Sequence, residues 1–89
     1  MEIEFDPAKS DRNLAERGFG FRFAARVFQG RPVSFQDSRH DYGEVRMVAI
    51  GEIDGKLYKV VYNDRDEIRR IISANPASRQ EKRLWHMSE

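Results

Sequence analysis

The chain has 89 residues, which is enough for one small domain with a modest hydrophobic core. It contains no cysteine, which excludes disulfides, thiolate zinc sites and a thiol nucleophile. The 16 basic and 15 acidic residues leave a net charge of +1, less than most nucleic-acid-binding domains carry. Most of the basic residues are arginine, whose planar fork suits phosphate, although a general compositional bias toward arginine would give the same count. No run approaches the ~20 apolar residues of a membrane span, so we expect a cytoplasmic protein without a membrane partner.

The first third of the chain predicts a short strand followed by two helices. Residues 2–5 alternate charged and apolar side chains, as an edge strand does. Asp6 and Pro7 suit the N-cap and first position of a helix, and Gly18 is a natural left-handed stop. A second helix is predicted over residues 21–29, because apolar side chains recur there at i, i+3, i+4 and i+7.

The remainder predicts a strand meander and one more helix. The predicted strands are residues 33–35, 44–51, 56–63 and 68–74. Polar turns at short intervals separate them, which favours antiparallel neighbours. Ser78 and Glu81 match the capping box of a C-terminal helix. We therefore predict an α+β fold in one domain, residues 1–89, with an antiparallel sheet of about four strands, two N-terminal helices and one C-terminal helix.

Two arginines interrupt otherwise apolar strands. An arginine in such a strand is costly unless its head reaches water, an acid or a ligand anion, and Arg46 and Arg70 are both placed this way. If they face the same side, they form a cationic strip across the sheet. The alternative is that they reach solvent along their stems or pair with Glu44 and Glu67.

The turn segment DSRHDYGEVR, residues 37–46, concentrates ionisable side chains. His40 titrates near neutral pH, and Glu44 beside an arginine can serve as a base. Where the nucleophile is the 2′-OH of RNA, cleavage needs a base, an acid and cations for the phosphorane charge, but no metal. A solvated loop is the alternative. The two histidines lie far apart and no ligand spacing is present, so no metal and no cofactor are expected.

The last helix carries a basic face beside an aromatic residue. Arg79, Lys82, Arg83 and His86 follow helical spacing, and Trp85 is placed to stack a base. The alternative is a solvated helix face with Trp85 in the core.

The order of these segments resembles the BrnT toxins of bacterial type II toxin–antitoxin systems over nearly the whole chain. The matching pieces are FDPAKSDRNLAERG, AARVF, DSRHDYGEVRMVAIG, KLYKVVYNDRDE and RRIISANPASRQEKR. The resemblance implies a RelE-like fold and a small ribonuclease that cleaves RNA without a metal and arrests translation. It also implies a BrnA-type ribbon-helix-helix antitoxin as the partner. The toxin would contact DNA only indirectly, through this antitoxin. Whether the complex contains a homodimer or is a heterotetramer stays open.

The resemblance also assigns residues by position. The catalytic candidates are His40, Glu44, Arg46, Arg70 and Arg79. Apart from the resemblance, the charge and aromatic pattern of the sequence gives the RNA-binding candidates, which are Arg39, Arg69, Lys82, Arg83 and Trp85. Relatives usually have His-Gly where this chain has Arg17-Gly18, and basic residues where it has Asn75-Pro76. These departures leave a second hypothesis open, a catalytically weak or inactive homologue that acts as a binding module in an autoregulatory DNA-bound complex.

Overall fold

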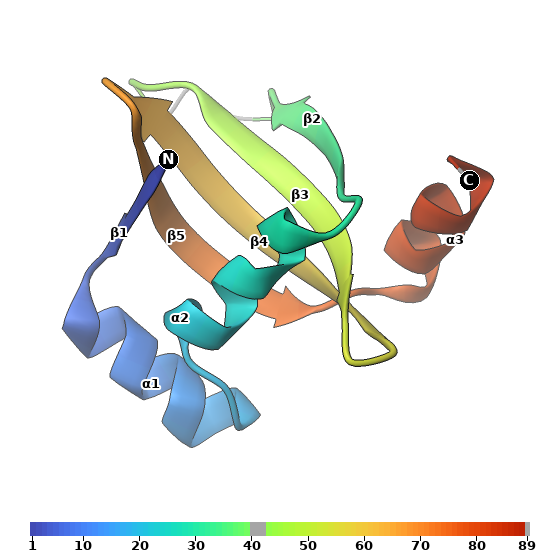
Figure 1. Cartoon of the computed structure of the whole chain (residues 1–89), viewed down its shortest axis with the longest axis horizontal. Helices are drawn as coiled ribbons and strands as arrows, with labels where there is room; N and C mark the ends of the chain where they lie inside the picture. Colours follow the sequence, from blue (N-terminus) through green and yellow to red (C-terminus); the bar gives the residue numbers. More distant parts are fainter. Residues whose placement is uncertain (40–42, 89) are drawn as a thin grey trace.

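A computed structural model of the chain describes residues 1–39 and 43–88 (Figure 1). The elements, in chain order, are β1 (Glu2–Phe5), α1 (Pro7–Arg17), α2 (Phe21–Ala24), the 3-10 helix η1 (Ala25–Gln29), β2 (Val33–Asp37), β3 (Arg46–Ile53), β4 (Lys56–Arg65), β5 (Ile68–Pro76) and α3 (Arg79–Met87). The predicted α+β class is confirmed, whereas the finer RelE-like assignment stays a prediction.

The described strands form one sheet in the order β1-β5-β4-β3-β2. The meander from β2 to β5 is antiparallel, as the turn spacing predicted. The prediction of about four strands in an antiparallel sheet is wrong, because β1 joins as a fifth strand and pairs parallel to β5. No local turn links these two strands, so the periodicity of residues 2–5 indicated a strand without indicating its partner.

The predicted helix ends are confirmed by their hydrogen bonds and dihedral angles. The Asp6 carboxylate accepts from the amide of Ala8 at 2.9 Å, and Gly18 ends α1 with a φ of 85°. Ser78 and Glu81 form both bonds of the capping box that begins α3. The second helix is α-helical only as far as Ala24 and continues as η1, a tighter coil that is common at helix ends.

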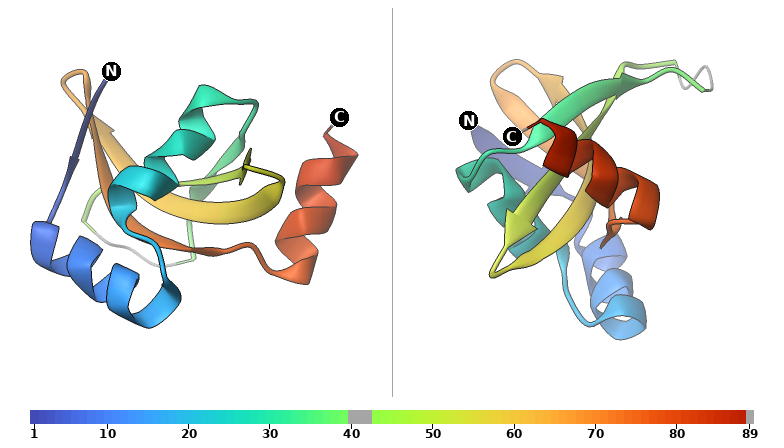
Figure 2. Two further views of the ribbon diagram at one scale, coloured as in Figure 1. Left: turned by 60° about the horizontal axis from the view of Figure 1, so that its bottom comes forward. Right: turned by 90° about the vertical axis from the view of Figure 1, so that its right-hand side faces the viewer.

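Helices lie on both faces of the sheet, α2 and η1 on one and α3 on the other (Figure 2), and an apolar cluster lies on each face. On one face, α2 and η1 pack against alternate side chains of β3 to β5, including Ala49 and Ile71. On the other face, Trp85 of α3 packs with Val48 and Ile50. Successive residues of a strand point to opposite faces, so each strand residue can be assigned to the α2 face or to the α3 face.

Glycine at position 51 allows η1 to lie directly on the sheet. A Cβ added at Gly51 would stand 2.9 Å from the Cβ of Val27, closer than carbon atoms pack. Because of this glycine, η1 packs in close contact with the α2 face. The ion pairs of Arg46 and Arg70 lie on the opposite, α3, face.

The turn between β4 and β5 carries backbone strain. Asp66 and Glu67 have φ angles of 51° and 67°, in a region that costs a side chain bearing a Cβ about 1 kcal/mol. We expect Glu67→Gly to raise the free energy of unfolding by about 0.5–1 kcal/mol in urea titrations. The same substitution at Glu52, an exposed position inside β3, should lower it by a similar amount, because glycine weakens a strand. Equal effects at the two positions would contradict the assignment of strain to Glu67.

Candidate functional site

Arg46 and Arg70 lie on the same face of the sheet. Their chain neighbours Met47 and Ile71 both pack in the cluster on the α2 face, so the two arginines point to the α3 face. Asn63 of β4 is paired with Arg70 and donates a hydrogen bond to the carbonyl oxygen of Val45, the residue before β3. The two arginines therefore meet the condition of a shared face that the sequence analysis set for a strip, the Arg46–Arg70 strip, with one strand between its two members.

Each of the two arginines contacts a carboxylate. Arg46 Nε lies 3.5 Å from Glu44 Oε1, as predicted. Arg70 Nη1 lies 3.0 Å from Glu4 Oε2, so the predicted pairing of Arg70 with Glu67 is wrong. The parallel pairing of β1 with β5 sets Glu4 directly beside Arg70, which the sequence alone did not reveal. The side chains of Arg70 and Glu4 are about half exposed, 48% and 49%, so their pair contributes little to stability and an anion can replace the carboxylate.

A cavity of about 460 Å³ opens beside this pair. Residues of β1, β4, β5 and the turns beside them line it, among them Glu4, Glu44, Asn63, Arg65, Asp66 and Arg70. It brings together two of the predicted catalytic residues, Glu44 and Arg70. Sequence reasoning missed Arg65 and Asn63, although two-residue alternation along residues 56–65 would have placed them on one face once the register with β5 was known.

Two further ion pairs occupy the α3 face nearer to the last helix. Arg39 donates to both carboxylate oxygens of Asp37, at 3.0 and 3.1 Å, and the Asp37 side chain is only 5% exposed. Lys59 Nζ lies 3.3 Å from Glu81 Oε2. The α3 face thus carries alternating charges, in which Arg39, Arg46, Lys59 and Arg70 each have a carboxylate within 3.5 Å.

Arg69 is directed away from the candidate site. It occupies the α2 face, where its guanidinium lies 4.4 Å from the ring centroids of Phe28 and Tyr62. It donates to both oxygens of Asp64 at 2.8 Å, and this hydrogen bonding raises the pKa of Arg69 above its ordinary value, against the effect of burial. The geometry is that of a structural arginine, and it does not favour the RNA-binding role predicted for Arg69.

Trp85 is a core residue, as the alternative interpretation held. It is 8% exposed, its Nε1 donates to the carbonyl oxygen of Arg31 at 3.1 Å, and the Arg31 guanidinium lies 4.8 Å from its ring centroid. A base cannot stack on a ring that is enclosed in this way, so the predicted stacking role of Trp85 does not fit the structure.

The basic residues of α3 do not act as one surface. Lys82 and His86 line one cavity, whereas Arg83 lines another with Phe35 and Met87. Arg79 is exposed on the first turn of α3. The predicted basic face therefore borders two cavities and does not line a single one.

The α3 helix begins some distance from the Arg46–Arg70 strip. Glu81 contacts Lys59, which lies four residues before Asn63 on β4 and thus about 13 Å away along the strand. His40, the remaining catalytic candidate, lies outside the described residues. Among the residues that are described, no group of three His, Cys, Asp or Glu side chains is arranged to hold a metal ion, and no helix is long and apolar enough to cross a membrane.

Comparison with known protein families gives one match. The family model described as "Ribonuclease toxin, BrnT, of type II toxin-antitoxin system" matches residues 5–81. The chain belongs to the BrnT family. The resemblance seen in the sequence is confirmed, and the family it belongs to is one of ribonuclease toxins. Among curated proteins, no match was found. Within this BrnT chain the matched range includes Glu44, Arg46, Arg70 and Arg79 and ends before Lys82.

The Glu81 carboxylate links α3 to the sheet and makes this contact sensitive to acid. Burial raises its pKa, but hydrogen bonds from the Ser78 amide and from Lys59 outweigh burial and lower the pKa below the ordinary value of a glutamate. A group with a lowered pKa in the folded state contributes stability above its unfolded pKa, about 4.3, and loses it as the pH falls. We expect Glu81→Gln to lower the free energy of unfolding at pH 6, and this difference from the unsubstituted chain should shrink toward pH 3.

Urea titrations at several pH values measure this difference. Lys59→Gln serves as the companion variant, because removing one of the groups that lower the pKa should weaken the pH dependence. A Glu81→Gln effect of the same size at pH 6 and pH 3 would contradict the role assigned to the carboxylate.

Proposed function

We propose that this chain is a metal-independent endoribonuclease toxin that cleaves RNA in the cytoplasm, arrests translation and is neutralised by a BrnA-type ribbon-helix-helix antitoxin. The observation that carries the proposal is the placement of Arg46 and Arg70 on one face of the sheet, with Glu44 beside them. Two guanidinium groups on alternate strands suit the oxygens of a single phosphodiester. Family membership supports the ribonuclease class, and the site geometry supports the assignment of residues.

The proposed reaction is attack by the 2′-OH of RNA on the adjacent phosphorus. A base removes the proton of the 2′-OH, the P–O5′ bond breaks, and an acid gives a proton to the departing 5′-oxygen. The products are a 2′,3′-cyclic phosphate and a 5′-OH. Glu44 and His40 are the two proton carriers of this scheme, and which of them is the base stays open.

The arginines would stabilise the negative charge that develops on the phosphorane. Preorganised donors of this kind contribute about 10²–10³-fold each to the rate. The phosphate must first replace Glu4 at Arg70, and the exposure of that pair makes the exchange inexpensive. Replacement of Glu44 at Arg46 would also free the Glu44 carboxylate to act as a base. Arg79 is in the first turn of α3, and α3 contacts the sheet at Lys59, four residues of β4 away from Asn63. Arg79 would hold an adjoining part of the same RNA strand.

A second function is favoured by a specific observation, the ion pairing of both site arginines with carboxylates. A chain whose arginines keep these partners would act as a binding module in an antitoxin complex on DNA and would not cleave RNA. The two functions differ in whether the purified chain breaks RNA.

Incubation of the purified protein with RNA in EDTA tests the proposal directly. We expect fragments that end in a 2′,3′-cyclic phosphate, detected by mass spectrometry of the 3′ ends, because the scheme requires no metal. Intact RNA would reject the nuclease and favour the binding module. Fragments with 3′-OH ends would reject the 2′-OH mechanism.

Substitution of the site arginines tests the assignment of residues. We expect Arg46→Ala and Arg70→Ala each to lower the cleavage rate by about 10²-fold or more and to relieve growth arrest when the chain is expressed without antitoxin. Arg12→Ala, on the exposed surface of α1, removes the same charge elsewhere and should retain full activity. Circular dichroism confirms folding, and Arg70→Ala is the cleaner variant because its pair with Glu4 is half exposed. Undiminished toxicity of the double variant Arg46→Ala/Arg70→Ala would contradict the assignment of these two arginines to the site.

A further inference from the structure

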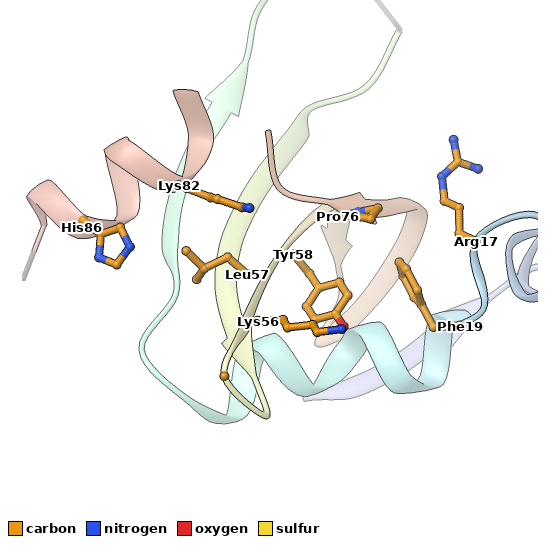
Figure 3. Close-up of a pocket in the computed structure, with 9 residues that line it drawn as sticks. Arg17, Phe19, Lys56, Leu57, Tyr58, Pro76, Lys82 and His86 are labelled. Carbon is orange, nitrogen blue, oxygen red and sulfur yellow. The ribbon is translucent and has the colours of Figure 1, made fainter. Parts of the chain in front are cut away.

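A second cavity, of about 530 Å³, lies at the opposite end of the sheet from the Arg46–Arg70 strip. Four basic side chains line it, together with aromatic side chains: Arg17, Lys56, Lys82, His86, Phe19 and Tyr58. They come from the end of α1 and the residues that follow it, from the start of β4, and from α3. Figure 3 shows Lys82 and His86 on one side, Arg17 and Phe19 on the other, and Lys56 and Tyr58 between them.

The charge of this cavity differs from that of the candidate active site. No carboxylate of the described residues lines it, and within this part of the chain Arg17, Lys56 and Lys82 form no ion pair. On the α3 face, by contrast, Arg46 and Arg70 each have a carboxylate oxygen within 3.5 Å. A free polyanion is therefore attracted more strongly to the second cavity than to the Arg46–Arg70 strip, because the charges of Arg17, Lys56 and Lys82 are not compensated.

The wall of the cavity adds apolar surface to these charges, mainly from the half-buried Tyr58, because Phe19 is only 9% exposed. The rings of Phe19 and Tyr58 meet edge to face, with centroids 5.0 Å apart, and both contribute to the lining. The volume falls in the range of small-ligand sites. Cations beside aromatic rings are the arrangement that binds a phosphate together with the base it carries.

The cavity is also placed to take part of a strand that reaches the active site. Leu57 lines the cavity and points to the α3 face, and it lies six residues before Asn63 on β4, which corresponds to about 20 Å along the strand. A single-stranded nucleic acid of a few nucleotides spans this length. The cations would hold the strand at one end of the sheet while the Arg46–Arg70 strip acts at the other.

We propose that this cavity is a nucleotide-binding subsite, which holds phosphate on the cations Arg17, Lys56 and Lys82 and the base against the half-buried ring of Tyr58. The ligand chemistry is a nucleoside phosphate, and RNA as its source rests on the proposed function. The subsite is not catalytic, and it supplies affinity that the neutralised arginines of the active site lack.

Binding of a short single-stranded 2′-deoxy oligonucleotide tests the proposal, because DNA lacks the 2′-OH and survives whether or not the chain is a nuclease. We expect Arg17→Ala/Lys82→Ala to weaken binding about tenfold and to reduce the slope of log K against log salt by roughly 0.7, the value for one lost phosphate contact. Lys9→Ala/Arg12→Ala, which removes the same two charges from the exposed surface of α1, should leave both quantities nearly unchanged. Equal losses in the two double variants would overturn the proposal, since they would report only net charge.

Nuclear magnetic resonance titrations distinguish the sources of the phosphate. Adenosine 5′-monophosphate should shift the amide signals of Gly55, Lys56 and Leu57, and inorganic phosphate should do so only at higher concentration. Equal affinity for the two ligands would overturn the role of the Tyr58 ring. An acidic polyglutamate peptide that binds there when nucleotides do not would overturn the proposal in favour of a protein partner.

The failure of this inference and the failure of the proposed function give different results. Arg70→Ala should abolish RNA cleavage but retain binding of the deoxy-oligonucleotide, because Arg70 does not line the second cavity. A chain that binds the oligonucleotide at Lys82 but never cleaves RNA would refute the nuclease and leave the subsite standing. If the chain cleaves RNA but Arg17→Ala/Lys82→Ala binds the oligonucleotide with unchanged affinity, the subsite would be refuted and the nuclease would stand.

Discussion

The short length of α3 is the constraint on which the site depends. Nine helical residues extend about 13.5 Å, whereas the ten residues of β4 extend about 33 Å, so the helix covers only part of the face on which it packs. Where α3 lies, the face is apolar and Trp85 is enclosed. Beyond the helix, Arg70 and Arg46 lie on that face, with side chains 48% and 28% exposed. The other face is packed against α2 and η1.

Local chemistry made much of this fold predictable. The caps at Asp6 and Ser78 and the Asp54-Gly55 turn are decided by interactions between residues close in sequence. The same is true of the shared face of Arg46 and Arg70, because strand alternation needs only the strand and one buried neighbour. The partner of β1 could not be predicted in this way, since parallel pairing depends on residues at opposite ends of the chain.

The candidate site was predictable to the same extent. Glu44 beside Arg46 is a local pair, whereas Glu4 beside Arg70 depends on the pairing of β1 with β5. Arg69 is the neighbour of Arg70 in β5, so strand alternation places it on the other face of the sheet, where its guanidinium lies against Phe28 of η1. Its structural role is visible only from the packing of η1 and not from the sequence. Trp85 was open to two interpretations because helical spacing alone does not show which side of α3 meets the sheet. The second cavity joins three distant segments and had no signal in the sequence.

The Glu4–Arg70 contact joins residues 66 positions apart. Contacts of such long range form late, because chain entropy opposes them until the intervening elements are in place. During synthesis, β1 leaves the ribosome first but has no partner strand until β5 has emerged. The edge of the candidate site therefore cannot be completed until β5 has emerged, however early β1 leaves the exit tunnel.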